Sequence, residues 1–174
     1  MMKTFLISIF IFITSFLSAQ SQIVDIPNKD LFDKYWSLVE DKNSENESLK
    51  EWIPSFESEK TWTKSFGIQH YKMPEDYDIH YFYQMFIETL SKDFKEGKEP
   101  FKHKVHEKDM NHILFSWWSN GPDLEIGREW IHILKSKDNQ VLFVRFATKN
   151  FKEDQDDSIW RECLKKAAFL QETQ

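Results

Sequence analysis

The sequence predicts an α+β domain in which an antiparallel meander sheet of about five strands packs with three helices. Alternating apolar and polar residues recur in the second half of the chain at short separations, as strands joined by hairpins require. Three other segments repeat their apolar residues with helical spacing. The expected order is α-β-α-β-β-β-β-α. Helices on one face of the sheet would make two layers, and helices divided between both faces would make three.

The chain begins with the organisation of a secretory signal peptide. Lys3 precedes an apolar stretch from Phe5 to Leu17, and small residues follow as far as Ala19. The stretch is shorter than the ~20 residues that cross a bilayer as a helix, which favours cleavage over a retained anchor. We therefore expect residues 1–19 to be removed and residues 20–174 to form one globular domain. Its composition is typical of a bacterial protein, periplasmic or secreted.

Charge restricts the binding partners that this protein can have, and cysteine content restricts its covalent cross-links. The formal net charge of −6 becomes −7 when Lys3 leaves with the leader. An acidic surface repels nucleic acid and anionic membranes, so we expect no nucleic-acid partner and no stable membrane insertion after cleavage. Cys163 is the only cysteine, which makes an intrachain disulfide impossible. Stability must then come from apolar burial, for which the chain after the leader has all seven Trp and twelve of the 16 Phe.

The first half of the chain predicts a helix, a strand and a second helix. Asn28 can cap the first helix, expected from Lys29 to about Asp41, and Asn43–Ser48 reads as a polar loop after it. Alternation predicts a strand from Trp62 to Tyr71.

Pro74 suits the first turn of the second helix and Gly97 suits its end. The apolar stripe of this helix comprises Ile79, Phe82, Tyr83, Phe86, Leu90 and Phe94.

Four strands and a last helix are expected in the second half. The helix should run from about Ser158 to Gln171. The strands should span Phe101–Glu107, His112–Trp118, Glu125–Lys135 and Gln140–Thr148. In topology alone, the resulting order resembles the Mog1/PsbP-like and DcrB-like group of small α/β proteins.

The last predicted hairpin carries the candidate binding residues. A two-residue turn at Asp138-Asn139 would place His132 directly opposite Arg145. One face of the hairpin would then be a core face with Ile131, Ile133, Leu142, Val144 and Phe146. The other would mix aromatic and cationic side chains, and Trp117 or Trp118 of the neighbouring strand would extend it. The candidate ligand-binding set is Arg128, Trp130, His132, Arg145 and Trp117.

Two interpretations of that second face stay open. It is either a half-covered sheet face, whose arginines pair with carboxylates such as Glu125, or a surface that binds a ligand. Stacking aromatics and guanidinium groups would suit an anionic or sugar-like molecule, or an acidic segment of a partner protein. The ligand interpretation predicts that Arg145→Ala abolishes binding and leaves the melting temperature nearly unchanged.

The sequence assigns no catalytic residue, metal ligand or cofactor. His106-Glu107 begins a zinc-protease motif, but Met110 stands where the second histidine should be, and strand geometry separates His106 from His103 and His112. Asp154–Asp157 lacks the ligand spacing of a calcium loop. Cys163 lies on the apolar stripe of the last helix and is expected to be a buried structural thiol.

Three functions follow from these observations. The preferred one is an exported, non-enzymatic binding or interaction protein whose ligand is unknown. A periplasmic inhibitor or immunity-type protein that neutralises a toxin is the second, because an acidic surface can occlude a basic cleft. The third is a hydrolase whose site is not visible in the sequence, which a pocket lined by His132 and a carboxylate of raised pKa would favour.

Overall fold

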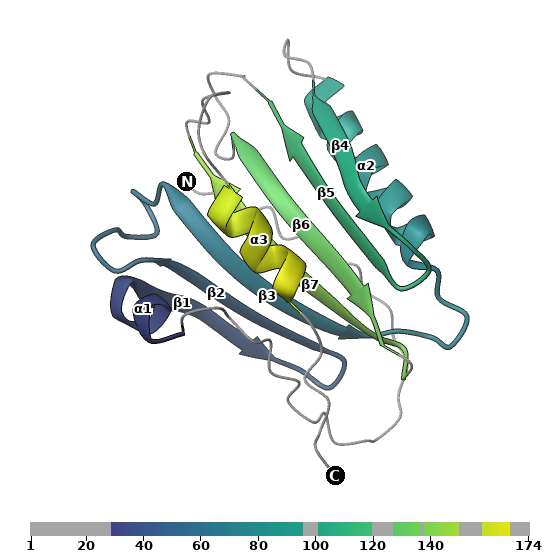
Figure 1. Cartoon of the computed structure of the whole chain (residues 1–174), viewed down its shortest axis with the longest axis horizontal. Helices are drawn as coiled ribbons and strands as arrows, with labels where there is room; N and C mark the ends of the chain where they lie inside the picture. The colour runs from purple at the N-terminus through teal and green to yellow at the C-terminus, as the bar shows by residue number, and fades with distance from the viewer. Residues whose placement is uncertain (1–28, 96–100, 120–126, 137, 150–157, 168–174) are drawn as a thin grey trace.

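A computed structural model shows an α+β protein built on one seven-stranded antiparallel sheet (Figure 1). The structure describes residues 29–95, 101–119, 127–136, 138–149 and 158–167. The strand order is β1-β2-β3-β7-β6-β5-β4. The strands span Trp36–Asn43 (β1), Glu47–Pro54 (β2), Lys64–Lys72 (β3), Lys102–Lys108 (β4), His112–Trp118 (β5), Arg128–Lys135 (β6) and Gln140–Thr148 (β7).

Three helices cover the two faces of this sheet, so the protein has three layers. Helices α1 (Lys29–Tyr35) and α3 (Ser158–Lys166) lie on one face, and α2 (Ile79–Lys95) lies on the other (Figure 1). We call these the α3 face and the α2 face. In the part of the chain that the structure describes, no helix is long and apolar enough to cross a membrane.

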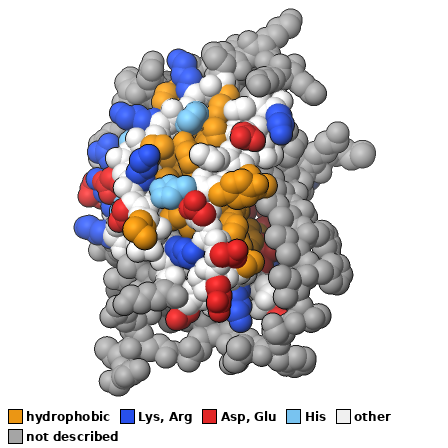
Figure 2. Space-filling model, turned by 90° about the vertical axis from the view of Figure 1, so that its right-hand side faces the viewer, with side chains coloured by type: hydrophobic (Ala, Val, Ile, Leu, Met, Phe, Trp, Pro, Cys, Tyr) orange, Lys and Arg blue, Asp and Glu red, His pale blue; other side chains and the backbone are white. Residues whose placement is uncertain are grey.

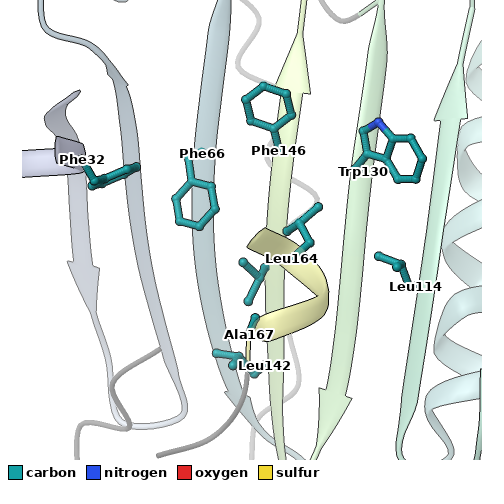
Figure 3. Close-up of a cluster of buried hydrophobic side chains, with 9 residues drawn as sticks. Phe32, Phe66, Leu114, Trp130, Leu142, Phe146, Leu164 and Ala167 are labelled. Atoms are coloured by element: carbon teal, nitrogen blue, oxygen red, sulfur yellow. The ribbon is translucent and has the colours of Figure 1, made fainter. Parts of the chain in front are cut away.

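Each face has its own hydrophobic core. On the α3 face, Leu164 of α3 packs on Phe66, Phe146 and Trp130 of three adjacent strands (Figure 3). On the α2 face, Ile79 at the start of α2 packs on the alternate residues of β5, β6 and β7. Because strand side chains point alternately to opposite faces, the central strands are apolar on both sides and read as nearly continuous hydrophobic runs.

The start of the sheet differs from the prediction of about five strands. The helix expected from Lys29 to Asp41 ends at Tyr35, whose carbonyl accepts a 2.8 Å hydrogen bond from the Ser55 amide beyond β2. The chain then continues as strand β1. Ser44 and Glu47 close a hairpin inside the predicted polar loop, and β2 follows, which brings the strand count to seven. The proposed cap Asn28 lies outside the described residues.

The second helix begins at Ile79, five residues after Pro74, which was expected in its first turn. Pro74 belongs to a turn in which its carbonyl accepts the Tyr77 amide at 3.1 Å. Asp78 caps the helix instead, because its carboxylate accepts the His80 amide at 2.8 Å. The apolar stripe from Ile79 to Leu90 faces the sheet as predicted; Gly97 and the side chain of Phe94 are outside the described residues.

The strands of the second half lie where the sequence predicts them, but the last hairpin has another turn. Lys135 pairs with Val141, and the Ser136 amide donates to the Gln140 carbonyl at 2.9 Å, which leaves a loop of three residues. Asn139 in this loop has a φ of 58°. The three-residue loop shifts the pairing by one residue, and His132 faces Val144 while Arg145 faces Ile131. A one-residue shift moves side chains to the opposite face, so the predicted composition of both faces was wrong.

Candidate functional site

The five predicted site residues divide between the two faces of the sheet. Trp130 and His132 point to the α3 face, and Arg128 lies over the Trp130 ring. Trp117 and Arg145 point to the α2 face, where both approach the carboxylate of Glu129. The two halves of the predicted site are therefore separated by the sheet, because β6 and β7 pair in the shifted register.

Trp130 is the centre of the aromatic and cationic side chains on the α3 face. The His106 ring stacks on it with centroids 4.5 Å apart. The guanidinium carbons of Arg128 and Arg161 lie 4.6 Å and 5.9 Å from its centroid, and Arg128 also lies 5.7 Å from the Trp118 ring. Cations over tryptophan faces are attracted by the ring quadrupole, so this arrangement links β5 and β6 to α3.

His106 shares the α3 face with Lys104, because alternate residues of β4 point to the same side, and its Nε2 lies 2.9 Å from the Ser116 hydroxyl. A β-bulge between Val105 and Glu107 then brings Glu107 opposite Leu114, on this same face. Burial lowers the pKa of His106 to about 4, and four surrounding cations act in the same direction. We call these four residues the cationic cluster: Lys104, Arg128, Arg161 and Lys165.

Within the described part of the chain, acidic residues neutralise this cluster only partly. Glu107 pairs with Lys165 at 2.6 Å, and Glu162 lies 3.8 Å from the same ammonium group. No described carboxylate is within ion-pair distance of Lys104 or Arg161. The predicted partner of Arg128, Glu125, is outside the described residues. A protein with a formal net charge of −6 therefore concentrates positive charge along the side of α3 that carries Arg161 and Lys165.

His132 is an interior residue rather than part of an open binding surface. Only 5% of its surface is exposed, and its Nδ1 lies 2.7 Å from the carbonyl oxygen of Leu164 in α3. Desolvation by burial lowers the pKa of this ring, although the hydrogen bond to Leu164 opposes the shift. The His112 ring meets it edge-on, with centroids 5.6 Å apart.

The α2 face holds a buried charge network across five strands. Glu129 is 4% exposed and accepts a 2.8 Å hydrogen bond from the Trp117 indole. Arg145 lies 3.9 Å from Glu129 and 3.5 Å from Glu51. Burial raises the pKa of the Glu129 carboxyl, and Arg145 limits that rise. Arg145 thus compensates buried acids, as in the half-covered-face interpretation.

Gly67 of β3 lets the side chain of Arg145 pass over β3 toward Glu51 of β2. A Cβ on Gly67 would lie 2.7 Å from Nε and 3.0 Å from Cγ of Arg145. We expect Gly67→Ala to lower the free energy of unfolding by ~1–3 kcal/mol in urea denaturation, since overpacking forces strained side-chain positions. The same substitution in an Arg145→Ala background should cost much less. An equal cost in both backgrounds would show that the clash is not with Arg145.

The described residues contain no convergent catalytic or metal-binding set. The carboxyl of raised pKa is Glu129, on the opposite face from His132, so the pair that would favour a hydrolase is not assembled. His103 bonds Tyr83 of α2, away from His106 and His112, and no group of three or more His, Cys, Asp or Glu could hold a metal ion there. Burial raises the pKa of the half-buried Cys163 thiol to about 11. Asp154–Asp157 lies outside the described residues.

Sequence reasoning missed most of the cationic cluster. Lys104 and Arg161 lie far apart in the sequence, and the two strands and the helix that bring the cluster together come from three separate segments. The alternation of Lys102, Lys104 and His106 in β4 was the one available signal, because such residues share a face until the bulge. Elsewhere, charges of both signs surround hydrophobic and histidine side chains, as the view in Figure 2 shows.

Comparisons with family models, with curated proteins and with solved structures find no match for this chain. The topological resemblance to the Mog1/PsbP-like group accordingly stays a prediction from the sequence.

Proposed function

We propose that this protein is an exported, non-enzymatic binding protein whose ligand is a small anionic molecule held at the cationic cluster. The observation that carries the proposal is the convergence of Lys104, Arg128, Arg161 and Lys165 around the stacked rings of His106 and Trp130, in an otherwise acidic protein. The signal-peptide-like leader, residues 1–19, supports export to the periplasm or beyond.

The chemistry of the cluster selects the ligand class. Guanidinium groups donate paired hydrogen bonds to carboxylate and phosphate oxygens, and two arginines lie near the same indole ring. The half-buried Trp118 offers a further aromatic surface beside Arg128. His106 is neutral at pH 7 because burial and the surrounding cations lower its pKa, so the positive charge of the cluster comes from its lysines and arginines. Sugar acids and phosphorylated or carboxylated metabolites fit this description.

Arg161 is the residue through which the proposal can be tested most directly. We expect intrinsic tryptophan fluorescence and calorimetric titration to detect saturable binding of at least one of three probes: inorganic phosphate, succinate and glucuronate. Arg161→Gln should weaken that binding at least tenfold, because the amide cannot replace the charged fork. Glucose, which is uncharged, should not bind at this site.

Lys166→Ala provides a matched control, since Lys166 is an exposed cation of α3 outside the cluster. It should leave affinity unchanged, and 0.5 M NaCl should weaken binding to the unaltered protein through screening. Failure of all three probes to bind, or equal effects of the Arg161 and Lys166 substitutions, would contradict the proposal.

A further inference from the structure

His132 sits at the contact between strand β6 and helix α3 with only one of its two ring nitrogens engaged. A carbonyl oxygen can only accept, so Nδ1 must carry the hydrogen that it donates to Leu164, and the neutral ring has an unprotonated Nε2. That Nε2 atom is buried and has no hydrogen-bond partner among the residues that the structure describes. Protonation of Nε2 would therefore bury both a charge and an unsatisfied donor.

The charged groups around His132 are already engaged with other partners. From β5, His112 faces the ring and pairs with Asp109 at 2.8 Å. From the end of β4, Glu107 bonds Lys165 of α3. Glu107 and Asp109 favour protonation of His132 and His112 opposes it, but burial is the largest influence and the net effect is a lowered pKa. Across from His132, β7 presents only the apolar Val144.

Helix α3 depends on this contact surface for its stability. It has nine residues, and an isolated helix of that length is marginal in water. Trp160 anchors its first half by stacking on Phe146 at 4.3 Å, whereas Leu164 and the His132 hydrogen bond hold its last turn. Movement of that last turn away from the sheet would expose the buried ring to water.

We infer that α3 is an acid-sensitive clamp, whose last turn leaves the sheet when His132 becomes protonated. The direction of the pH effect follows from the pKa of His132, which is lower in the folded protein than the ordinary histidine value of the unfolded chain. Neutral His132 in the folded protein contributes stability above the ordinary histidine pKa of 6.5, and this contribution is lost as the pH falls below that value. Release of the last turn would also carry Lys165 away from the cationic cluster, and so weaken binding there if the proposed function holds.

Amide hydrogen exchange on the ligand-free protein tests this inference, so its outcome is independent of the proposed function. Lowering the pH from 7.5 to 5.0 should accelerate exchange of the amides at 162–166, after correction for intrinsic rates. This acceleration should be at least tenfold greater than that of the amides of β6 and β7. His132→Asn should abolish this difference, because the Asn amide can donate to the Leu164 carbonyl without titrating. His103→Asn, on the α2 face, should retain it.

Three outcomes would overturn the inference. The acid response of α3 could be absent from the unaltered protein, it could persist in His132→Asn, or it could disappear in His106→Asn, in which His132 is retained. If His132→Asn does not fold, an NMR titration of the His132 ring in the unaltered protein replaces it. A ring midpoint that coincides with the midpoint of α3 exchange would support the clamp, and clearly separate midpoints would overturn it.

Discussion

Phe146→Ala is expected to lower the free energy of unfolding by about 3–5 kcal/mol, the usual range for truncating a buried Phe. Phe146 is fully buried at the centre of β7, and its ring stacks on Trp160 with centroids 4.3 Å apart and planes within 8°. Its removal opens a cavity between the sheet and α3 and eliminates an aromatic contact that holds this short helix. Urea denaturation followed by far-ultraviolet circular dichroism measures the change.

Phe56→Ala is the matched control, because the same truncation is made at a side chain that is 83% exposed. It should change stability by no more than ~0.5 kcal/mol. The Phe146 variant should also lose Trp160 protection in fluorescence quenching before global unfolding, since α3 loses its principal ring contact. If Phe146→Ala costs no more than Phe56→Ala, the packing of α3 on the sheet described above is wrong.

Arg145→Ala is expected to destabilise the protein by about 3 kcal/mol at pH 7, the low end for breaking a buried ion pair, because Arg145 is 33% exposed. Its loss leaves the buried Glu129 without the cation that limits the rise of its pKa. A raised carboxyl pKa favours the folded state at low pH and disfavours it as the pH rises. The deficit relative to the unaltered protein should therefore shrink between pH 7 and pH 4.5 in urea titrations.

A double-mutant cycle separates this charge effect from lost packing. Glu129→Leu combined with Arg145→Leu should recover most of the stability lost in Arg145→Leu alone, since a buried pair can be replaced by apolar residues at little cost. This expectation reverses the one that followed from the ligand interpretation, in which Arg145→Ala would leave the melting temperature unchanged. A strictly additive cycle would show that Arg145 and Glu129 do not interact.

The elements with a strong periodic signal were predictable from the sequence. The strands at His112–Trp118 and Gln140–Thr148 and the stripe of α2 appear where their patterns place them. The β1–β2 hairpin was not predictable, because each face of β2 mixes apolar with charged residues and β1 continues directly from a helix. Its strands are recognised only by the neighbours with which they pair.

The candidate site likewise contains residues that the sequence placed correctly and residues that it misplaced. Trp130 and Arg128 were identified from alternation within one strand, and they do lie together. His132 and Arg145 were brought together only by an assumed two-residue turn, and one additional loop residue placed them on opposite faces. Turn length is a property of a few local dihedral angles, yet it determines the face of every side chain in the hairpin.

The sequence by itself determined the fold class, the acidic character and the dependence on aromatic burial, because composition and periodicity are local properties of the chain. The signal-peptide-like leader is also a property of the sequence alone, and it lies outside the described residues. Only the tertiary structure decided that the helices divide between two faces, that Arg145 forms an ion pair with Glu129, and that α3 brings Arg161 to Trp130. These contacts join different segments of the chain, and their geometry depends on a strand register that periodicity alone does not specify.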